Sequence, residues 1–235
     1  MQLSIVIPAY NEGGRITTTL ESYCSFYQGR DAEIIVILNG CRDATLDIVK
    51  SFRGRYPNVV RFKDFEEALG KGGAVHEGFK IAKGEFVGFL DADGSTAPEE
   101  FQKLTRAIDG ADGAIASRWK QGSIVEGRKH FRKIVSLGFV IVVRILFWLP
   151  FNDTQCGAKV FKRKLIDTVL PELVITNMAF DVELLYRARK HGFSIKEIPS
   201  HWIDKSSSTV LGSPSQVAGS GIGMLLSLIR IRLTR

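Results

Sequence analysis

Short apolar runs recur along the first half of this chain, and each run is followed by turn residues and a helical stretch. The runs are Leu3–Pro8, Glu33–Asn39, Val59–Lys63, Glu85–Asp91 and Gly113–Ser117. Apolar runs bounded by turns indicate buried strands of a parallel sheet. Their alternation with helices predicts an α/β fold: a doubly wound, mostly parallel sheet with helices on both faces. The 235 residues suffice for one such domain.

The second half of the chain departs from this rhythm. We expect a turn and strand, a helix, a further strand and a final helix over Asn152–Phe161, Met178–His191, Phe193–Ile198 and Gln216–Leu233. A stretch rich in Ser and Gly precedes the last apolar residues. We therefore expect residues 1–205 to form the α/β domain and residues 206–235 a separate amphipathic helix.

Two segments, Ile134–Leu149 and Val217–Leu233, are strongly apolar but short of the ~20 residues that a membrane-spanning helix needs. Arg144 interrupts the first segment, and Arg230 and Arg232 lie near the end of the second. Basic residues beside apolar faces are typical of helices that lie in a membrane interface. The competing interpretation of the first segment is a helix packed under the sheet as core.

The net charge of +7 predicts an anionic partner: nucleic acid, anionic lipid or a phosphorylated substrate. Leu3–Pro8 is too short for a signal peptide and lacks a basic leader. Three cysteines without a C-x-x-C motif predict neither a disulfide framework nor a zinc site, and they fit a reducing cytosol. We therefore expect a cytoplasmic protein, peripheral on the cytoplasmic face of a membrane.

The run Glu85–Asp91 carries two acids at its end, Asp91 and Asp93. In open α/β sheets, ligands bind outside the carboxyl ends of the strands. Two carboxylates there repel each other unless a cation lies between them. Oxygen ligands suit Mg²⁺ or Mn²⁺, and these ions commonly also hold substrate phosphates. The sequence thus predicts a metal–diphosphate site, and the alternative is an acidic turn.

Six motifs occur in a fixed order between Leu3 and about Trp202. They are Pro8-Ala9-Tyr10-Asn11-Glu12, Gly70-Lys71-Gly72-Gly73-Ala74-Val75, Asp91-Ala92-Asp93-Gly94, Ser117-Arg118, Asp153-Thr154-Gln155-Cys156-Gly157 and Ala179-Phe180-Asp181-Val182-Glu183-Leu184-Leu185-Tyr186. In these motifs the chain resembles the family 2 glycosyltransferases of GT-A fold. It resembles most closely the dolichyl-phosphate β-glucosyltransferases, with the dolichyl-phosphate mannose synthases as near relatives.

The resemblance implies an inverting transfer of a hexose, glucose or mannose, from a UDP- or GDP-linked sugar to a polyprenyl (dolichyl) phosphate. It implies that Asp91 and Asp93 hold a divalent metal, Mg²⁺ or Mn²⁺, together with the sugar nucleotide. It places Arg118 on phosphates and Asp181 where inverting members have a general base. The nucleotide pocket is implied for Pro8, Ala9, Tyr10 and Glu12.

Four further features of the sequence bear on the nucleotide site. Asn39 replaces an aspartate that touches the base in the resembling enzymes, so we expect it to read the base, and uracil and guanine both stay open. Leu69–Gly73 is glycine-rich, and we expect its backbone N–H groups to approach a phosphate. Lys71 is expected either to neutralise the diphosphate or to lie in solvent. Ser95 replaces a glutamine of the mannose synthases.

Asp181 shares the inward face of a predicted helix with Leu184 and Leu185, and an acid on an apolar stripe needs a partner. A site role and an ion-paired or capping role are the two interpretations. We expect Glu183 and Arg187 to form a surface pair.

The basic run Arg128–Lys133 precedes the first apolar segment. We expect Arg128 and Arg132 to contact the acceptor phosphate, and the alternative is a solvated charged face.

Three other classes of protein fit parts of the sequence. A polysaccharide-type transferase usually shows Gln-x-x-Arg-Trp, and Arg118-Trp119 lacks the glutamine. A sugar nucleotidylyltransferase needs a basic glycine-rich loop after the first strand, where Tyr10–Gly14 is acidic. A binding module for nucleic acid or anionic lipid explains the charge but not the paired acids. We expect no nucleic-acid partner, and a soluble or glycan acceptor is the alternative to a lipid.

Overall fold

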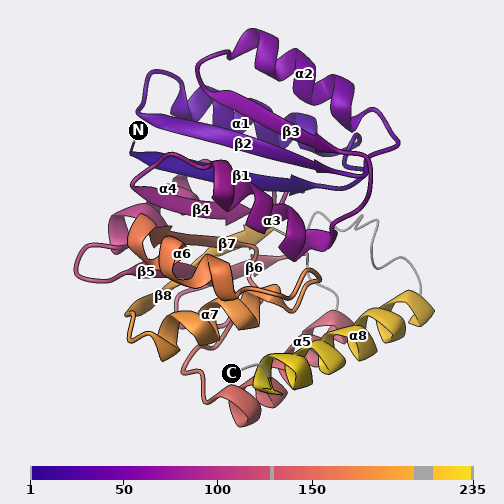
Figure 1. Cartoon of the computed structure of the whole chain (residues 1–235), viewed down its shortest axis with the longest axis vertical. Helices are drawn as coiled ribbons and strands as arrows, with labels where there is room; N and C mark the ends of the chain where they lie inside the picture. The colour runs from indigo at the N-terminus through magenta and orange to yellow at the C-terminus, as the bar shows by residue number, and fades with distance from the viewer. Residues whose placement is uncertain (1, 128–129, 204–213, 234–235) are drawn as a thin grey trace.

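The computed structural model describes residues 2–127, 130–203 and 214–233, with the side chains of 130–135, 214–220 and 222 excepted. Its centre is a seven-stranded sheet of order β3-β2-β1-β4-β7-β5-β8 (Figure 1). These strands are β1 (Leu3–Ala9), β2 (Ala32–Asn39), β3 (Val60–Phe65), β4 (Phe86–Leu90), β5 (Gly113–Ser117), β7 (Ala158–Lys162) and β8 (Ile195–Pro199). A small second sheet pairs β6 (Ile124–Glu126) with β9 (His201–Ile203).

Strand β7 is the one departure from parallel pairing in the large sheet as described. It lies between β4 and β5 and runs antiparallel to both, whereas the other neighbouring strands pair in parallel. As a result, the start of β7 lies at the same edge as the carboxyl ends of β4 and β5. That edge therefore collects the residues that follow the parallel strands and those that precede β7.

Helices cover both faces of the sheet (Figure 1). One face carries α1 (Ile16–Tyr27), α2 (Thr45–Arg55) and α4 (Pro98–Ala107). The other carries α3 (Gly70–Ile81), α5 (His130–Phe147), α6 (Arg163–Val169), α7 (Phe180–Lys190) and α8 (Pro214–Leu233), with a 3₁₀ turn at Leu170–Glu172. Alternate residues of β1 enter the two cores, Ile5 and Ile7 on one side and Val6 on the other, because strand side chains alternate between faces.

Helices α5 and α8 pack against each other and present apolar residues on two sides. Val143 and Phe147 of α5 and Leu228 and Ile231 of α8 enter the core. The opposite sides are exposed, in α5 at Leu137, Ile141 and Ile145 with Trp148 just beyond, and in α8 at Leu225, Leu226, Ile229 and Leu233. Within the described residues, neither helix nor any other is long and apolar enough to cross a membrane.

The expected α/β architecture is confirmed, and the predicted strands of the first half lie within a few residues of the observed ones. Elements that the sequence did not predict are β6, β9 and α6. The core interpretation of Ile134–Leu149 is confirmed for one side of α5. The other side is exposed, and its position in a membrane interface stays a prediction. The division at residue 205 stays a prediction, since residues 204–213 lie outside the described part.

Candidate active site

The two predicted metal ligands lie at the carboxyl edge of the sheet. Asp91 directly follows β4, and its backbone N–H donates to the carbonyl of Gly157 just before β7, at 3.0 Å. Gly157 is needed there for space. A Cβ at this position would lie 1.9 Å from Oδ2 of Asp91. The motif Asp153–Gly157 therefore leaves room for the Asp91 carboxylate, a function that the sequence did not reveal.

Lys71 reaches the same carboxylate from the first turn of α3. Its Nζ lies 2.6 Å from Oδ1 of Asp91, and the side chains are 18% and 36% exposed. The solvated alternative for Lys71 is therefore wrong. The expected contact with a diphosphate stays a prediction.

Asp93 and Glu12 complete an acidic group around Asp91. Burial and the nearby charge of Asp91 raise the pKa of Asp93. Burial also raises the pKa of Glu12, against the effect of Arg15 at 2.5 Å, and both aspartates add to the rise. The backbone N–H of Ser95 donates to Oδ1 of Asp93 at 2.9 Å. Two neighbouring carboxylates such as Asp91 and Asp93 favour a cation between them, because like charges repel.

The loop that carries the two aspartates is held from below by α1. Thr19 donates its hydroxyl to the carbonyl of Ala92 at 2.7 Å, and Tyr23 donates to that of Thr96 at 3.1 Å. Both bonds are buried, so the loop is fixed by the core and not by solvent-exposed contacts.

The glycine-rich start of α3 packs against protein, and the expected approach of its backbone N–H groups to a phosphate stays a prediction. A Cβ at Gly70 would lie 2.4 Å from the carbonyl oxygen of Thr176, and one at Gly72 would lie 2.6 Å from Phe180. Gly70 also has φ of +77°, which favours glycine. The space beside these glycines is thus filled by the segment before α7, and the packing holds Lys71 toward Asp91.

That segment is in turn fixed by Glu183. Its Oε2 accepts hydrogen bonds from the backbone N–H groups of Val174 and Ile175, at 3.0 and 2.8 Å. Glu183 and Arg187 are both buried, so the expected surface pair is wrong. A helical pair at i,i+4 looks the same in sequence whether it faces solvent or core.

Asp181 is almost fully buried and has an ion-pair partner. Nζ of Lys159, in β7, lies 2.5 Å from Oδ1 of Asp181 and 2.6 Å from the carbonyl oxygen of Cys156. Burial raises the pKa of Asp181, and the charges of Lys159 and Lys71 oppose the rise. Burying two charges is tolerated when each is paired and hydrogen-bonded. Lys159 was missed because a single lysine within a strand pattern normally faces solvent.

Arg118 is held rigidly by Asp153. The guanidinium donates from Nε to Oδ2 at 2.7 Å and from Nη2 to Oδ1 at 2.9 Å. Burial would raise the pKa of Asp153, but Arg118 outweighs it and keeps that pKa below its usual range. Glu197 accepts hydrogen bonds from the backbone N–H groups of Asn152 and Asp153, each at 2.8 Å. Glu197 thus positions Asp153, and Asp153 positions Arg118.

The residues expected at the nucleotide base surround the ends of β1 and β2. Pro8 and Ala9 close β1, and Tyr10 beyond them is exposed. Asn39 is buried, and its Oδ1 accepts a hydrogen bond from the backbone N–H of Leu69 at 2.5 Å. Asn39 therefore anchors the start of the α3 loop. Its contact with a base stays a prediction.

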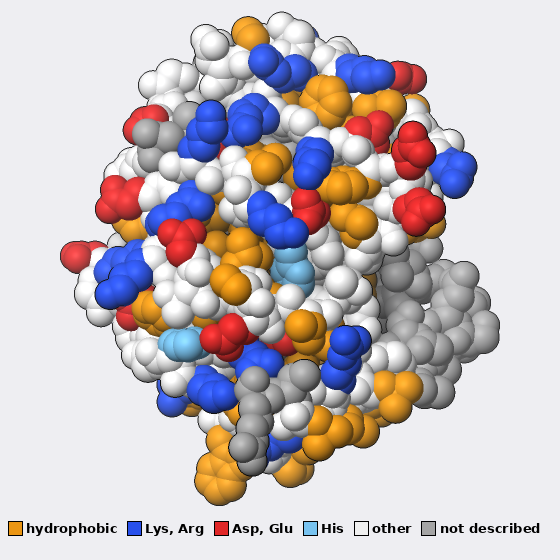
Figure 2. All heavy atoms as spheres, viewed as in Figure 1, with side chains coloured by type: hydrophobic (Ala, Val, Ile, Leu, Met, Phe, Trp, Pro, Cys, Tyr) orange, Lys and Arg blue, Asp and Glu red, His pale blue; other side chains and the backbone are white. Residues whose placement is uncertain are grey.

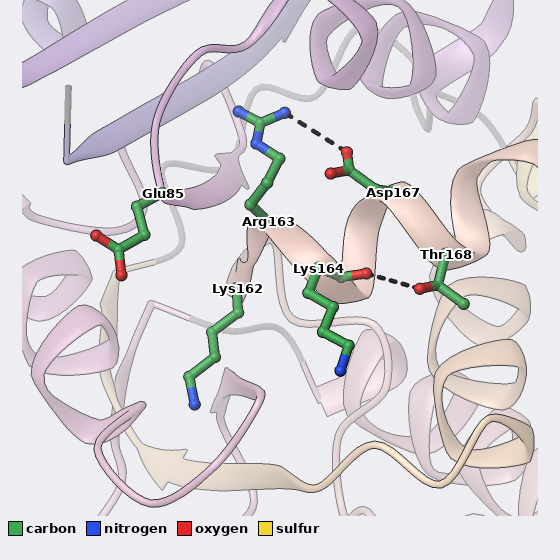
Figure 3. Close-up of a pocket in the computed structure, with 6 residues that line it drawn as sticks. All are labelled: Glu85, Lys162, Arg163, Lys164, Asp167 and Thr168. Atoms are coloured by element: carbon green, nitrogen blue, oxygen red, sulfur yellow. Dashed lines mark hydrogen bonds and ion pairs between the residues drawn. The ribbon is translucent and has the colours of Figure 1, made fainter.

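Two predicted acceptor contacts cannot be placed. Arg128 lies outside the described residues, and the side chain of Arg132 in α5 is likewise not described. A cavity of about 580 Å³ lies at the opposite edge of the sheet. It is lined by Glu85, Lys162, Arg163, Lys164, Asp167 and Thr168 (Figure 3). The guanidinium of Arg163 donates to the carbonyl of Gly84 and lies 3.9 Å from the carboxylate of Asp167, so its charge already has a partner within the protein.

In the described part of the chain, no group of three or more His, Cys, Asp or Glu side chains is arranged to hold a metal.

The architecture is that of the GT-A glycosyltransferases. Glucosyl-3-phosphoglycerate synthase from Mycobacterium tuberculosis, solved with UDP, superposes with a TM-score of 0.74 at 17% identity, over 98% of this chain and 80% of that one. At this level of identity the likeness shows the fold, which is GT-A, and the two carboxylates follow β4 at the carboxyl edge of its sheet.

Residues 4–170 match the model of Glycosyl transferase family 2, and the chain belongs to this family of enzymes. Curated relatives named dolichyl-phosphate beta-glucosyltransferase cover nearly the whole chain. The protein of Saccharomyces cerevisiae is 34% identical over 98% of this chain and 74% of its own length. That of Dictyostelium discoideum is 32% identical, over 98% and 73%, and that of Homo sapiens 32%, over 86% and 68%.

Proposed function

We propose that this glycosyltransferase moves glucose from a nucleotide-diphosphate sugar to dolichyl phosphate, or a related polyprenyl phosphate, at a membrane surface. The relatives named dolichyl-phosphate beta-glucosyltransferase are about one-third identical to this chain over most of both lengths. The observation that carries the proposal is the cation-ready pair Asp91 and Asp93 at the carboxyl end of β4, with Lys71 already bound to Asp91.

A divalent cation fits the residues at this edge. Gly157 leaves the space that the Asp91 carboxylate occupies, and the pKa of Asp93 is raised by burial and by the charge of its neighbour. Asp91 and Asp93 would hold Mg²⁺ or Mn²⁺, whose remaining ligands are commonly phosphate oxygens and water. When bound, the cation stabilises the negative charge that develops on the leaving diphosphate. Glucosyl-3-phosphoglycerate synthase from Mycobacterium tuberculosis, which has a similar fold, has been solved with Mn²⁺ and UDP and with Mg²⁺ and UDP.

The protein's own residues supply orientation and charge. The Arg118 guanidinium keeps donors beyond the two bonded to Asp153, and a fixed guanidinium suits a phosphate. Asn39, Tyr10 and Glu12 are proposed at the nucleoside. An acceptor phosphate is already anionic near neutral pH, so it attacks the anomeric carbon without a strong base.

The burial of Asp181 against Lys159 favours a positioning role over that of a general base. An acid that donates or accepts a proton in catalysis must reach the substrate. The paired carboxylate instead balances the charge of Lys71 and Lys159 beneath the site.

The exposed apolar sides of α5 and α8 are proposed to lie on the membrane that contains the lipid acceptor. Trp148 is 85% exposed, and Ile145, Ile229 and Leu226 are exposed beside it or on the neighbouring helix. Figure 2 shows hydrophobic side chains along the lower edge of the molecule, where Figure 1 draws these helices. Arg144 and Arg230 are exposed and suit anionic headgroups. Arg128 and Arg132 are proposed at the acceptor phosphate.

The experiment that tests the function is a donor screen. Radiolabelled UDP-glucose, GDP-mannose and their relatives are offered with dolichyl phosphate, and label in organic-extractable lipid is counted. We expect transfer from UDP-glucose, loss of transfer in EDTA, and at least a ~10²-fold loss of rate in Asp93→Asn. Transfer at the full rate in EDTA would contradict the metal role, and label in water-soluble product alone would contradict the lipid acceptor.

A further inference from the structure

The carboxylate of Asp91, one of the two proposed ligands of a divalent cation, is already paired with the ammonium of Lys71. Lys71 Nζ lies 2.6 Å from Oδ1 of Asp91, and the pair is partly accessible to solvent. A divalent ion that binds Oδ1 repels an ammonium held at the same oxygen, because both carry positive charge. Binding of the divalent ion there therefore competes with the ion pair between Asp91 and Lys71.

The protein holds Lys71 in place without fixing its ammonium. Because Gly70 and Gly72 lack side chains, the start of α3 packs closely against the segment before α7, and this packing fixes the backbone of Lys71. Its Nζ lies 6.0 Å from the ring centres of both Phe89 and Phe180, which form an apolar wall. Within the described part of the chain, the ammonium forms an ion pair with Asp91. The stem is four flexible carbons, so the charge can move while the backbone stays.

Arg118 shows the contrasting arrangement. Its guanidinium is held by two hydrogen bonds to Asp153, and Glu197 fixes the backbone of Asp153. Such a bidentate group is pre-organised and stays in place. The site therefore combines one fixed cation with one that can change partner.

We propose that Lys71 is an exchangeable counter-ion, which neutralises Asp91 in the empty site and passes to the donor diphosphate when a divalent cation takes Asp91. The inference rests on the proposed function, because it assumes the cation site at Asp91 and Asp93. Without a counter-ion the clustered carboxylates would repel one another. When Lys71 is the counter-ion, a divalent cation that binds alone must displace its ammonium from Asp91. When the diphosphate binds as well, the displaced ammonium gains a new anionic partner.

Two consequences are measurable. Removal of the ammonium should tighten binding of Mn²⁺ alone by about 2- to 5-fold, the loss of competition expected from one partly exposed ion pair. It should also weaken the coupling between Mn²⁺ and nucleotide, since coupling of two ligands is reciprocal and here depends on Lys71.

The experiment titrates the full chain with Mn²⁺ and follows free Mn²⁺ by electron paramagnetic resonance, with and without UDP. Without UDP, Lys71→Met and Lys71→Gln should each bind Mn²⁺ about 2- to 5-fold tighter than the wild type. Addition of UDP should strengthen Mn²⁺ binding less in these variants than in the wild type. Lys71→Arg should restore wild-type behaviour, because it keeps a cation beside Asp91. Circular dichroism checks that each variant is folded.

Two controls separate exchange from a general effect of charge. Arg15→Met removes a positive charge that is paired with Glu12, not with Asp91, and should tighten Mn²⁺ binding less than Lys71→Met. Lys80→Met, at an exposed lysine paired with Glu77, should change nothing. Wild-type Mn²⁺ affinity in both Lys71→Met and Lys71→Gln would overturn the inference. If the wild type binds no Mn²⁺, or if Asp93→Asn binds Mn²⁺ as well as the wild type does, the cation site of the proposed function is overturned instead.

Discussion

Gly157→Ala is the substitution that most directly tests how the site is built. The residue does not have a positive φ, so its backbone accepts alanine. The added Cβ would lie 1.9 Å from Oδ2 and 2.4 Å from Cγ of Asp91. Ordinary van der Waals contact begins at 3.4 Å, so the carboxylate must retreat by about 1.5 Å. The new methyl group therefore displaces the carboxylate from the place where it meets Lys71.

The expected effect is large on function and small on stability. A misplacement of about 1 Å in a catalytic constellation can cost ~10²-fold in rate, so we expect transfer to fall by at least about 10²-fold. The carboxylate is the flexible end of a side chain and can rotate away. The stability cost is therefore mainly the partly exposed ion pair with Lys71, about 1 kcal/mol or less.

The assay compares glucose transfer to dolichyl phosphate, Mn²⁺ affinity and thermal unfolding in wild type and variant. Gly54→Ala in α2 is the matched control, since a Cβ there meets nothing within 4 Å, and it should leave transfer unchanged. Transfer by Gly157→Ala within about threefold of wild type would refute the reasoning, because 1.5 Å of carboxylate movement would then be tolerated. Global unfolding of the variant would contradict the expected small loss of stability.

Three other predictions follow from single contacts. Asp153→Asn removes one charge from the pair with Arg118, and transfer should fall at least ~10-fold with little change in nucleotide affinity; an unchanged rate would dismiss the pair. Burial lowers the pKa of His76 from 6.5 to about 4, so the folded state binds fewer protons than the unfolded state between these values. This group should therefore lower the free energy of unfolding by about 3 kcal/mol as pH drops from 7 to 4. Urea denaturation should show a smaller fall over this pH range in His76→Gln than in the wild type. An equal fall in both proteins would contradict the lowered pKa of His76. Asn39→Ala leaves the Leu69 N–H without its acceptor and should weaken UDP binding by about 1–3 kcal/mol in calorimetry; an unchanged dissociation constant would remove Asn39 from the site.

Much of the fold could be predicted because it depends on local patterns. Buried strands appear as apolar runs, and the helices between them follow from residue periodicity. The position of Asp91 and Asp93 at one sheet edge followed from the same patterns, since carboxyl ends of parallel strands meet there. The glycine-rich start of α3 was recognised, but its packing against Thr176 and Phe180 was not.

What the sequence by itself determined, then, is the order of the elements and the chemical groups at their ends. What the tertiary structure decided is which group meets which. Lys159 finds Asp181, and Arg118 finds Asp153, across 22 and 35 positions of sequence. The reason is that β7 inserts antiparallel between β4 and β5, which buries Lys159 and brings Gly157 against Asp91. Strand order depends on the packing of the whole sheet, and no local pattern of residues encodes it.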